Sequence, residues 1–134
     1  MQLKLTGTRV NNLSFQKASV EDDTANSLSF GLFVSWSREE PSKSFSVSFD
    51  FKLLDSSGYQ IELEYEGSFE TEDIVDQEFM DSPWPQVNGA AIVYPYMRAF
   101  VSTLTINSGF EPAIIPSVNF QKMYADKVAN KIEE

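Results

Sequence analysis

Three glutamates at alternate positions, Glu62, Glu64 and Glu66, are the residues of this sequence whose type and spacing could do chemistry. On one face of a strand, neighbours in such a row lie about 6.5–7 Å apart, which suits the acid/base pair of a hydrolase or an oxygen site for a hard cation. An exposed row lacks the apolar pocket that raises a carboxyl pKa for proton transfer. We therefore expect a charged surface and not a catalytic pair.

The remaining composition also argues against an enzyme. The sequence has no histidine and no cysteine, so the usual general base, the common metal ligands and a thiolate nucleophile are missing. The 6 glycines are scattered and form no phosphate-binding loop. We expect no catalytic residue, no metal site and no cofactor.

Negative charge is concentrated in one segment of the chain. The net charge is −10, and residues 61–80 hold eight carboxylates without a Lys or Arg. Because nucleic-acid binding needs clustered cations, this distribution favours either a basic protein partner or a solvated face that maintains solubility. No apolar run reaches the ~18–20 residues that cross a bilayer, and the first ten residues lack a signal-peptide pattern. We expect a cytoplasmic protein without membrane insertion or a nucleic-acid partner.

Alternation of apolar and polar residues predicts four antiparallel strands in the first half of the chain. The clearest alternation covers residues 28–36, 44–53 and 61–66. A further strand over Leu3–Phe15 slips between Gly7 and Val10, which favours a bulge. One face of this sheet carries the glutamates, and the other is strongly apolar and must be covered. We predict a single α+β domain over residues 1–134.

Two helices in the second half are expected to cover the apolar face. After a proline-rich break at Asp81–Gln86, the first runs from about Asn88 to Asn107, and Gly109 takes the left-handed conformation after it. The extended segment Phe110–Val118 then leads to a last helix, for which Asn119 is a good N-cap. The last helix has a single apolar stripe, formed by Phe120, Met123, Tyr124, Val128 and Ile132.

The first of these helices is apolar around most of its circumference, although Pro95 lies inside it. One sheet face can bury only one stripe of a helix, so the other side implies a second subunit. The alternative is a core that encloses the helix within one chain. We predict a subunit interface through Ile92, Tyr96 and Phe100, with Pro95 bending the helix by removing the hydrogen bond to the carbonyl of Ala91.

Several short motifs occur together along the chain. They are Leu13-Ser14-Phe15, the strand Glu62–Phe69 with its Gly-x-Phe ending, Ile92–Arg98 (IVYPYMR), Ser108-Gly109-Phe110, Ile115–Phe120 (IPSVNF) and Tyr124. Their order and spacing are nearly those of the SecB family of protein-export chaperones, which the sequence resembles over almost its whole length.

The resemblance implies a four-stranded antiparallel sheet with two helices, assembled as a dimer of dimers, and no enzyme activity. It implies that unfolded client polypeptides bind, without ATP, in an apolar groove between the start of the second strand, the loop before it and the last helix. By position, the groove residues would be Leu28, Phe30, Leu32, Phe120, Met123 and Tyr124. Each of them can equally be an ordinary core residue.

The resemblance also suggests a partner for the acidic face of Glu62, Glu64 and Glu66. In the export chaperones an acidic sheet face docks the translocation ATPase SecA. Glu62 keeps one such acidic position, whereas Asn12 and Gln16 stand at two others. Some proteins of this type serve toxin–antitoxin systems instead. Two functions stay open: a general chaperone, with export and SecA docking, or a dedicated adaptor or antitoxin-type chaperone for one partner.

Overall fold

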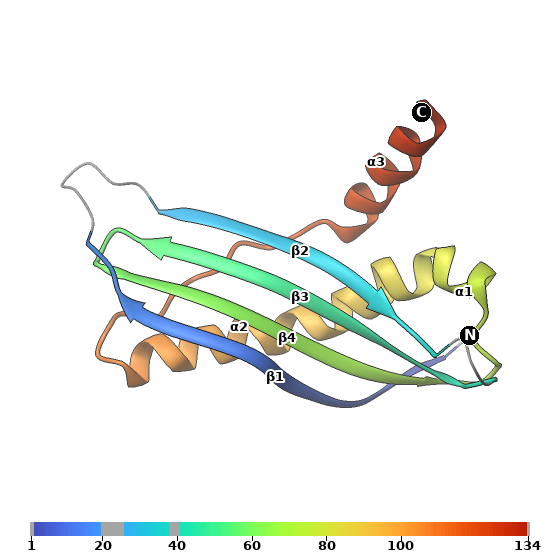
Figure 1. The fold of residues 1–134 in the computed structure, drawn as a ribbon, viewed down its shortest axis with the longest axis horizontal. Helices are drawn as coiled ribbons and strands as arrows, with labels where there is room; N and C mark the ends of the chain where they lie inside the picture. The colour runs from blue at the N-terminus through green and yellow to red at the C-terminus, as the bar shows by residue number, and fades with distance from the viewer. Residues whose placement is uncertain (1, 20–25, 38–40, 134) are drawn as a thin grey trace.

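The computed structural model describes residues 2–19, 26–37 and 41–133, and shows a sheet with helices packed on one side (Figure 1). The strands are β1 (Leu3–Lys17), β2 (Ser27–Ser35), β3 (Ser44–Asp55) and β4 (Tyr59–Thr71). The helical elements are α1 (Gln77–Asp81), the π-helix η1 (Trp84–Gly89), α2 (Ala90–Asn107) and α3 (Phe120–Glu133). The predicted α+β fold with four strands is confirmed. Most of the predicted loop between the first two strands, residues 20–25, lies outside the described residues.

The sheet is antiparallel throughout and has the order β1-β4-β3-β2, so that β1 and β2 are its edges. β2 pairs with β3 without a register shift from Ser27 to Ser35. β1 pairs with β4 less regularly, because its register shifts once between Leu5 and Gly7 and again between Val10 and Asn12. The bulge predicted between Gly7 and Val10 is therefore replaced by two irregularities, one on each side of that interval.

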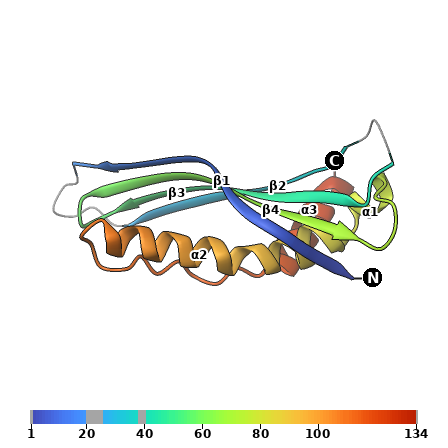
Figure 2. The ribbon, with the colours of Figure 1, turned by 90° about the horizontal axis from the view of Figure 1, so that it is seen from below.

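The core lies between the inner face of the sheet and α2, which runs along beneath the sheet (Figure 2). Alternate residues of β3 and β4 are buried there, as the period-2 pattern predicts. From α2, the buried residues are Ala90, Val93, Tyr94, Met97, Val101 and Thr105. Gly67 of β4 permits the close approach, because a Cβ at this position would lie 2.3 Å from Cγ2 of Val93.

The predicted proline-rich break before the long helix is wrong in part. α1 begins after Asp76, whose side chain accepts a hydrogen bond from the backbone N–H of Phe79 over 2.8 Å. η1 then leads directly into α2, with Pro83 at its N-cap and Pro85 in its first turn. Proline is tolerated in a first turn because the N–H it lacks would have no helical partner there. The chain therefore forms helical turns where a break was expected.

The segments around the last helix agree with the sequence. Gly109 has a φ of 91° after the end of α2. Residues 111–119 form neither helix nor strand, and the side chain of Asn119 accepts a hydrogen bond from the N–H of Lys122 over 3.0 Å. Both the left-handed glycine and the N-cap are confirmed.

The two long helices do not share the inner face equally. α2 covers the sheet along its length, whereas α3 contributes mainly its first turn, in which Phe120 is buried against Phe49 and Tyr94. The rest of α3 projects past β2 (Figure 1). Burial therefore decreases along the apolar stripe, from half-buried Met123 and Tyr124 to exposed Val128. The side chain of Ile132 lies outside the described part of the chain.

Candidate functional site

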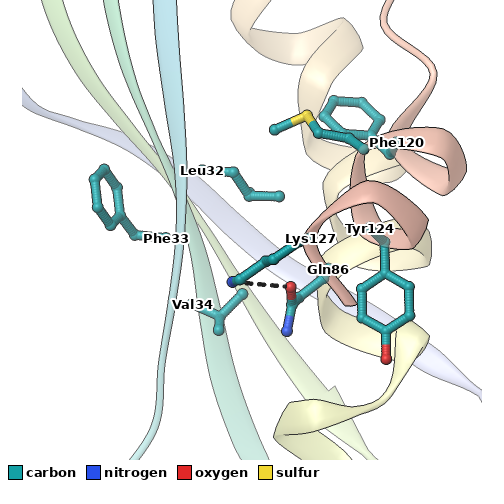
Figure 3. Close-up of a pocket in the computed structure, with 8 residues that line it drawn as sticks. Leu32, Phe33, Val34, Gln86, Phe120, Tyr124 and Lys127 are labelled. Carbon is teal, nitrogen blue, oxygen red and sulfur yellow. Dashed lines mark hydrogen bonds between the residues drawn. The ribbon is translucent and has the colours of Figure 1, made fainter. Parts of the chain in front are cut away.

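The first cavity of the candidate groove lies between β2 and the first turns of α3 and has a volume of about 280 Å³ (Figure 3). Its lining residues are Leu32, Phe33, Val34, Gln86, Phe120, Met123, Tyr124 and Lys127. Leu32 and Val34 point toward α3, whereas the ring of Phe33 points to the opposite side of β2. Four of the six predicted groove residues therefore meet at one cavity.

Polar contacts tie α3 to the elements before α2. The hydroxyl of Tyr124 donates a hydrogen bond to the carbonyl of Asp81 over 2.7 Å. The ammonium group of Lys127 donates to Oε1 of Gln86 over 3.3 Å (Figure 3). These contacts fix the wall of the cavity opposite β2 without filling the space between the two elements.

A second cavity, of about 690 Å³, lies farther toward the start of β2. Leu28, the fifth predicted groove residue, lines it together with Leu53 and Tyr59 of the sheet. Its other wall is the chain between α2 and α3, from Gly109 to Pro116. Asp55 and Glu111 also line it, so the charged residues of this cavity are acidic. The charged residue that lines the first cavity is the basic Lys127.

Phe30 lies between the two cavities and lines neither. Its ring is 5.6 Å from that of Phe49, 6.1 Å from that of Tyr94 and 6.3 Å from that of Phe120. Leu28, Phe30 and Leu32 lie on the same face of one strand, so the aromatic cluster lies between the two cavities along β2. Of the six predicted groove residues, Phe30 is thus the one that lines neither cavity.

The wall of the second cavity was missed as part of the site by sequence reasoning. We call Phe110–Val118 the crossover segment. Four hydrogen bonds hold it on α2. The Phe110 N–H donates to the carbonyl of Thr105 over 3.0 Å, and the Ala113 N–H donates to Thr105 Oγ1 over 2.9 Å. Ser102 Oγ donates to the carbonyl of Ala113 over 2.8 Å, and the Tyr94 hydroxyl donates to the carbonyl of Pro116 over 2.5 Å. The available signal was polar Ser and Thr within an otherwise apolar helix.

Tyr59 of the second cavity is harder to ionise than an ordinary tyrosine. Burial, together with the nearby Asp55 carboxylate, raises the pKa of Tyr59 to about 12. Its ring stacks on Phe15 at 5.3 Å and meets Phe110 at 4.6 Å, so the residue offers apolar surface to the cavity.

The predicted acidic face lies on the side of the sheet away from α2. Glu62 stands opposite Lys52 of β3, and Glu64 stands opposite Asp50 and opposite Asn12 of β1. Both glutamates are exposed. No group of three acidic or other ligating side chains suited to a metal ion occurs in the described ranges.

Glu66 differs from the other two glutamates because it is engaged within the sheet. Its side chain is only 16% exposed and accepts a hydrogen bond from Asn11 over 2.6 Å. Nη2 of Arg9 lies 3.5 Å from Oε2 of Glu66. The hydrogen bond from Asn11, with a smaller contribution from Arg9, holds the pKa of Glu66 below its ordinary value. This glutamate is therefore less available to a partner.

The residues predicted to form a subunit interface lie in two environments. Ile92 and Tyr96 are exposed on the side of α2 away from the sheet, and Ile106 extends this apolar surface toward the end of the helix. Phe100 is half-buried, with its ring 5.9 Å from that of Tyr65.

Within the described residues, no helix is long and apolar enough to cross a membrane.

Comparison with known protein families identifies the family of this chain. The family model described as preprotein translocase subunit SecB matches residues 10–131. The chain belongs to the SecB family. The resemblance inferred from the motifs is thereby confirmed.

Individual members of the SecB family are distant from this chain. An uncharacterised protein of Methanocaldococcus jannaschii is 29% identical, over 69% of this chain and 61% of its own length. Protein-export protein SecB of Jannaschia sp. is 23% identical, over 96% of this chain and 81% of its own length. The chain thus spans less than two thirds of the archaeal relative.

A solved structure supports the SecB fold. A SecB-like chaperone of Mycobacterium tuberculosis, in complex with an antitoxin peptide, superposes with a TM-score of 0.68. The match covers 87% of this chain and 89% of the other at 17% identity, which establishes a shared fold.

Proposed function

We propose that this protein is an ATP-independent chaperone that holds non-native polypeptides in its apolar groove. The observation that carries the proposal is the pair of cavities along β2, of about 280 and 690 Å³, with the aromatic cluster around Phe30 between them. Aromatic and Met side chains cover area adaptably, which suits binding of varied apolar segments. Leu28, Leu32, Met123 and Tyr124 are the contacts, and Phe30 and Phe120 form the packed base beneath them.

Suppression of aggregation tests this function directly. An unrelated protein is unfolded by heat or reduction, and its light scattering is followed with increasing amounts of this protein. We expect protection near stoichiometric ratios without ATP. Scattering that is unchanged at several-fold excess would rule out general chaperoning.

The second candidate function is a dedicated chaperone for one antitoxin-type partner. It is favoured by the similarity of the fold to a chaperone solved with an antitoxin peptide. A test compares affinity for generic unfolded proteins with affinity for peptides that together span an antitoxin encoded beside the gene. Strong binding of one such peptide, without binding of generic clients, supports the dedicated function. Equal binding of both supports the general one.

Two further surfaces complete the proposal. The outer side of α2, with Ile92 and Tyr96 and with Phe100 at its margin, serves assembly into a homo-oligomer, a dimer of dimers in the manner that the family resemblance implies. The exposed carboxylates Glu62 and Glu64 dock a basic partner segment, for which SecA is the candidate. The assembly surface is supported by the exposure of the apolar side chains of Ile92 and Tyr96. The docking surface is supported by the exposure of the carboxylates of Glu62 and Glu64.

A further inference from the structure

We propose that the bound polypeptide adds a strand to the free edge of β2, so that it extends the sheet over α3. The inference rests on the proposed chaperone function and states how the client is held: by its backbone as well as by its side chains. Backbone pairing gives affinity for any extended segment, since every residue except proline has the same donor and acceptor.

The edge of β2 lacks the features that usually protect an edge strand. Such edges are normally guarded against pairing by charges, prolines or bulges. β2, Ser27–Ser35 (SLSFGLFVS), has no charged residue and no proline, and its pairing with β3 is unbroken. β1, the other edge, contains Lys4, Arg9 and Lys17 and two register shifts. Within the part of the chain that is described, no strand occupies the outer side of β2.

α3 lies where it would support an added strand. It begins at the level of α2, beneath the sheet (Figure 2), and then projects outward past β2 (Figure 1). Its apolar stripe is only partly covered, because Met123 and Tyr124 are half-buried and Val128 is exposed. A strand next to β2 would cover the first turns of this stripe, because α3 starts beneath the sheet and rises toward its level at the C-terminal end (Figure 2).

The two cavities match the inward side chains of such a strand. Neighbouring strands lie about 4.8 Å apart, and alternate side chains of each point to the same face. Inward residues of an added strand would therefore stand beside Leu28 and Leu32, each of which lines one cavity. The cavities also differ in charge. Lys127 lines the first, where an acidic side chain of the client would be favoured, and Asp55 and Glu111 line the second, where a basic one would be favoured.

The outer face of β2 also offers contact to an added strand. Phe33 is 59% exposed there, and its ring lies close over Gly31, where a Cβ would be 3.2 Å from Cε2 of the ring. Outward side chains of an added strand would pack against this ring, because cross-strand aromatic pairs stabilise sheets.

A client segment fits this edge better than a second copy of the chain. In a continuous sheet formed by two β2 strands, each α3 would project beneath the sheet of its partner. That space is filled by α2 and the crossover segment. An extended client segment brings only side chains to the cavities.

Amide hydrogen exchange followed by NMR tests the proposal with a defined probe. The probe is a capped nine-residue peptide, the length of β2, in which Val and Phe alternate with Ser and Thr. In the free protein, alternate β2 amides bonded to β3 exchange slowly and the outward ones exchange fast. On peptide binding, we expect the outward set to slow by about tenfold or more.

Two modified peptides supply a matched control. Each carries backbone N-methyl groups at every second residue, in one or the other phase. Because successive N–H groups of a strand point to opposite edges, only one phase can pair with β2. The peptide whose methyl groups replace the N–H groups that face β2 should bind about tenfold or more weakly than the unmodified peptide. The peptide methylated on the opposite edge should bind as the unmodified peptide does.

The outcomes separate this inference from the chaperone function. If the peptide binds but outward β2 amides stay fast and both methylated phases bind equally, strand addition is wrong while groove binding stands. If outward amides are already slow without peptide and become fast on dilution, a second copy occupies the edge and the proposal is overturned. Absence of peptide binding overturns both.

Discussion

The hydroxyl of Tyr94 donates a hydrogen bond to the carbonyl of Pro116 over 2.5 Å, joining the middle of α2 to the end of the crossover segment. The ring of the same tyrosine meets Phe120 at 5.4 Å. One side chain of α2 thus fixes both the exit of the crossover segment and the first turn of α3. The position of the groove wall depends on this relationship.

Replacement Tyr94→Phe removes the hydrogen bond and leaves the aromatic contacts in place. We expect unfolding free energy to fall by about 1 kcal/mol, because the carbonyl of Pro116 loses its partner. Client affinity should fall as well, since the start of α3 loosens. Urea denaturation and peptide binding measure the two effects. Tyr96→Phe, two residues away on the exposed side, is the control; an equal loss there would contradict the role given to Tyr94.

Met123→Asp places a carboxylate in the smaller cavity. Because Met123 is half-buried in the groove, we expect several-fold weaker suppression of aggregation with little change in the fold. The control is Ile74→Asp, at a residue that is 57% exposed and lines neither cavity. Thermal unfolding confirms that both variants are folded. Full protection by the Met123 variant would move the client site away from α3.

Tyr96→Asp tests the outer side of α2 as a subunit interface. Tyr96 is 52% exposed in the single chain, and burying an unpaired carboxylate against a second subunit would be costly. We expect the variant to shift toward smaller species in size-exclusion chromatography with light scattering. Ile114→Asp, at a residue 86% exposed on the crossover segment, should leave the mass unchanged. A monomeric wild-type protein would show that the interface is wrongly assigned.

Glu62→Gln with Glu64→Gln tests the acidic face. We expect the double variant to bind the C-terminal segment of SecA a few-fold more weakly, because exposed ion pairs contribute about 0.2–1 kcal/mol each. The effect should shrink at high salt. Glu70→Gln, also exposed on β4, is the matched control. If the wild-type protein does not bind the segment at low salt, SecA is not the partner.

Asn11→Ala tests the engagement of Glu66 through pH. The pKa of Glu66 is lowered in the folded state, chiefly by the hydrogen bond from Asn11, so its stabilisation is present above the unfolded pKa of about 4.3 and is lost as pH falls through the folded value. We expect the variant to be less stable by about 1 kcal/mol at neutral pH. The difference should vanish in strongly acidic buffer. A difference that persists there would mean that Asn11 acts through packing.

The sequence predicted the sheet well because one of its faces is buried and one is exposed, which imposes an alternation that can be read directly. The helical turns near Pro83 and Pro85 were not predicted, since proline was taken to interrupt a helix although it fits a first turn. The stripe of α3 was identified, but its periodicity cannot say that α3 leaves the sheet after Phe120. The position of α3 relative to β2 depends on tertiary contacts, such as the hydrogen bond from Tyr124 to the carbonyl of Asp81.

The uncharged edge of β2 has a consequence for the behaviour of the protein in concentrated solution. A strand that accepts other chains is also a site at which copies of the protein can aggregate. The outer face of the same sheet carries Glu62 and Glu64, and the net charge of −10 makes copies repel one another before their edges meet. Salt screens this repulsion and leaves the edge unchanged. We therefore expect association through the edge to be opposed by net charge and to increase with ionic strength.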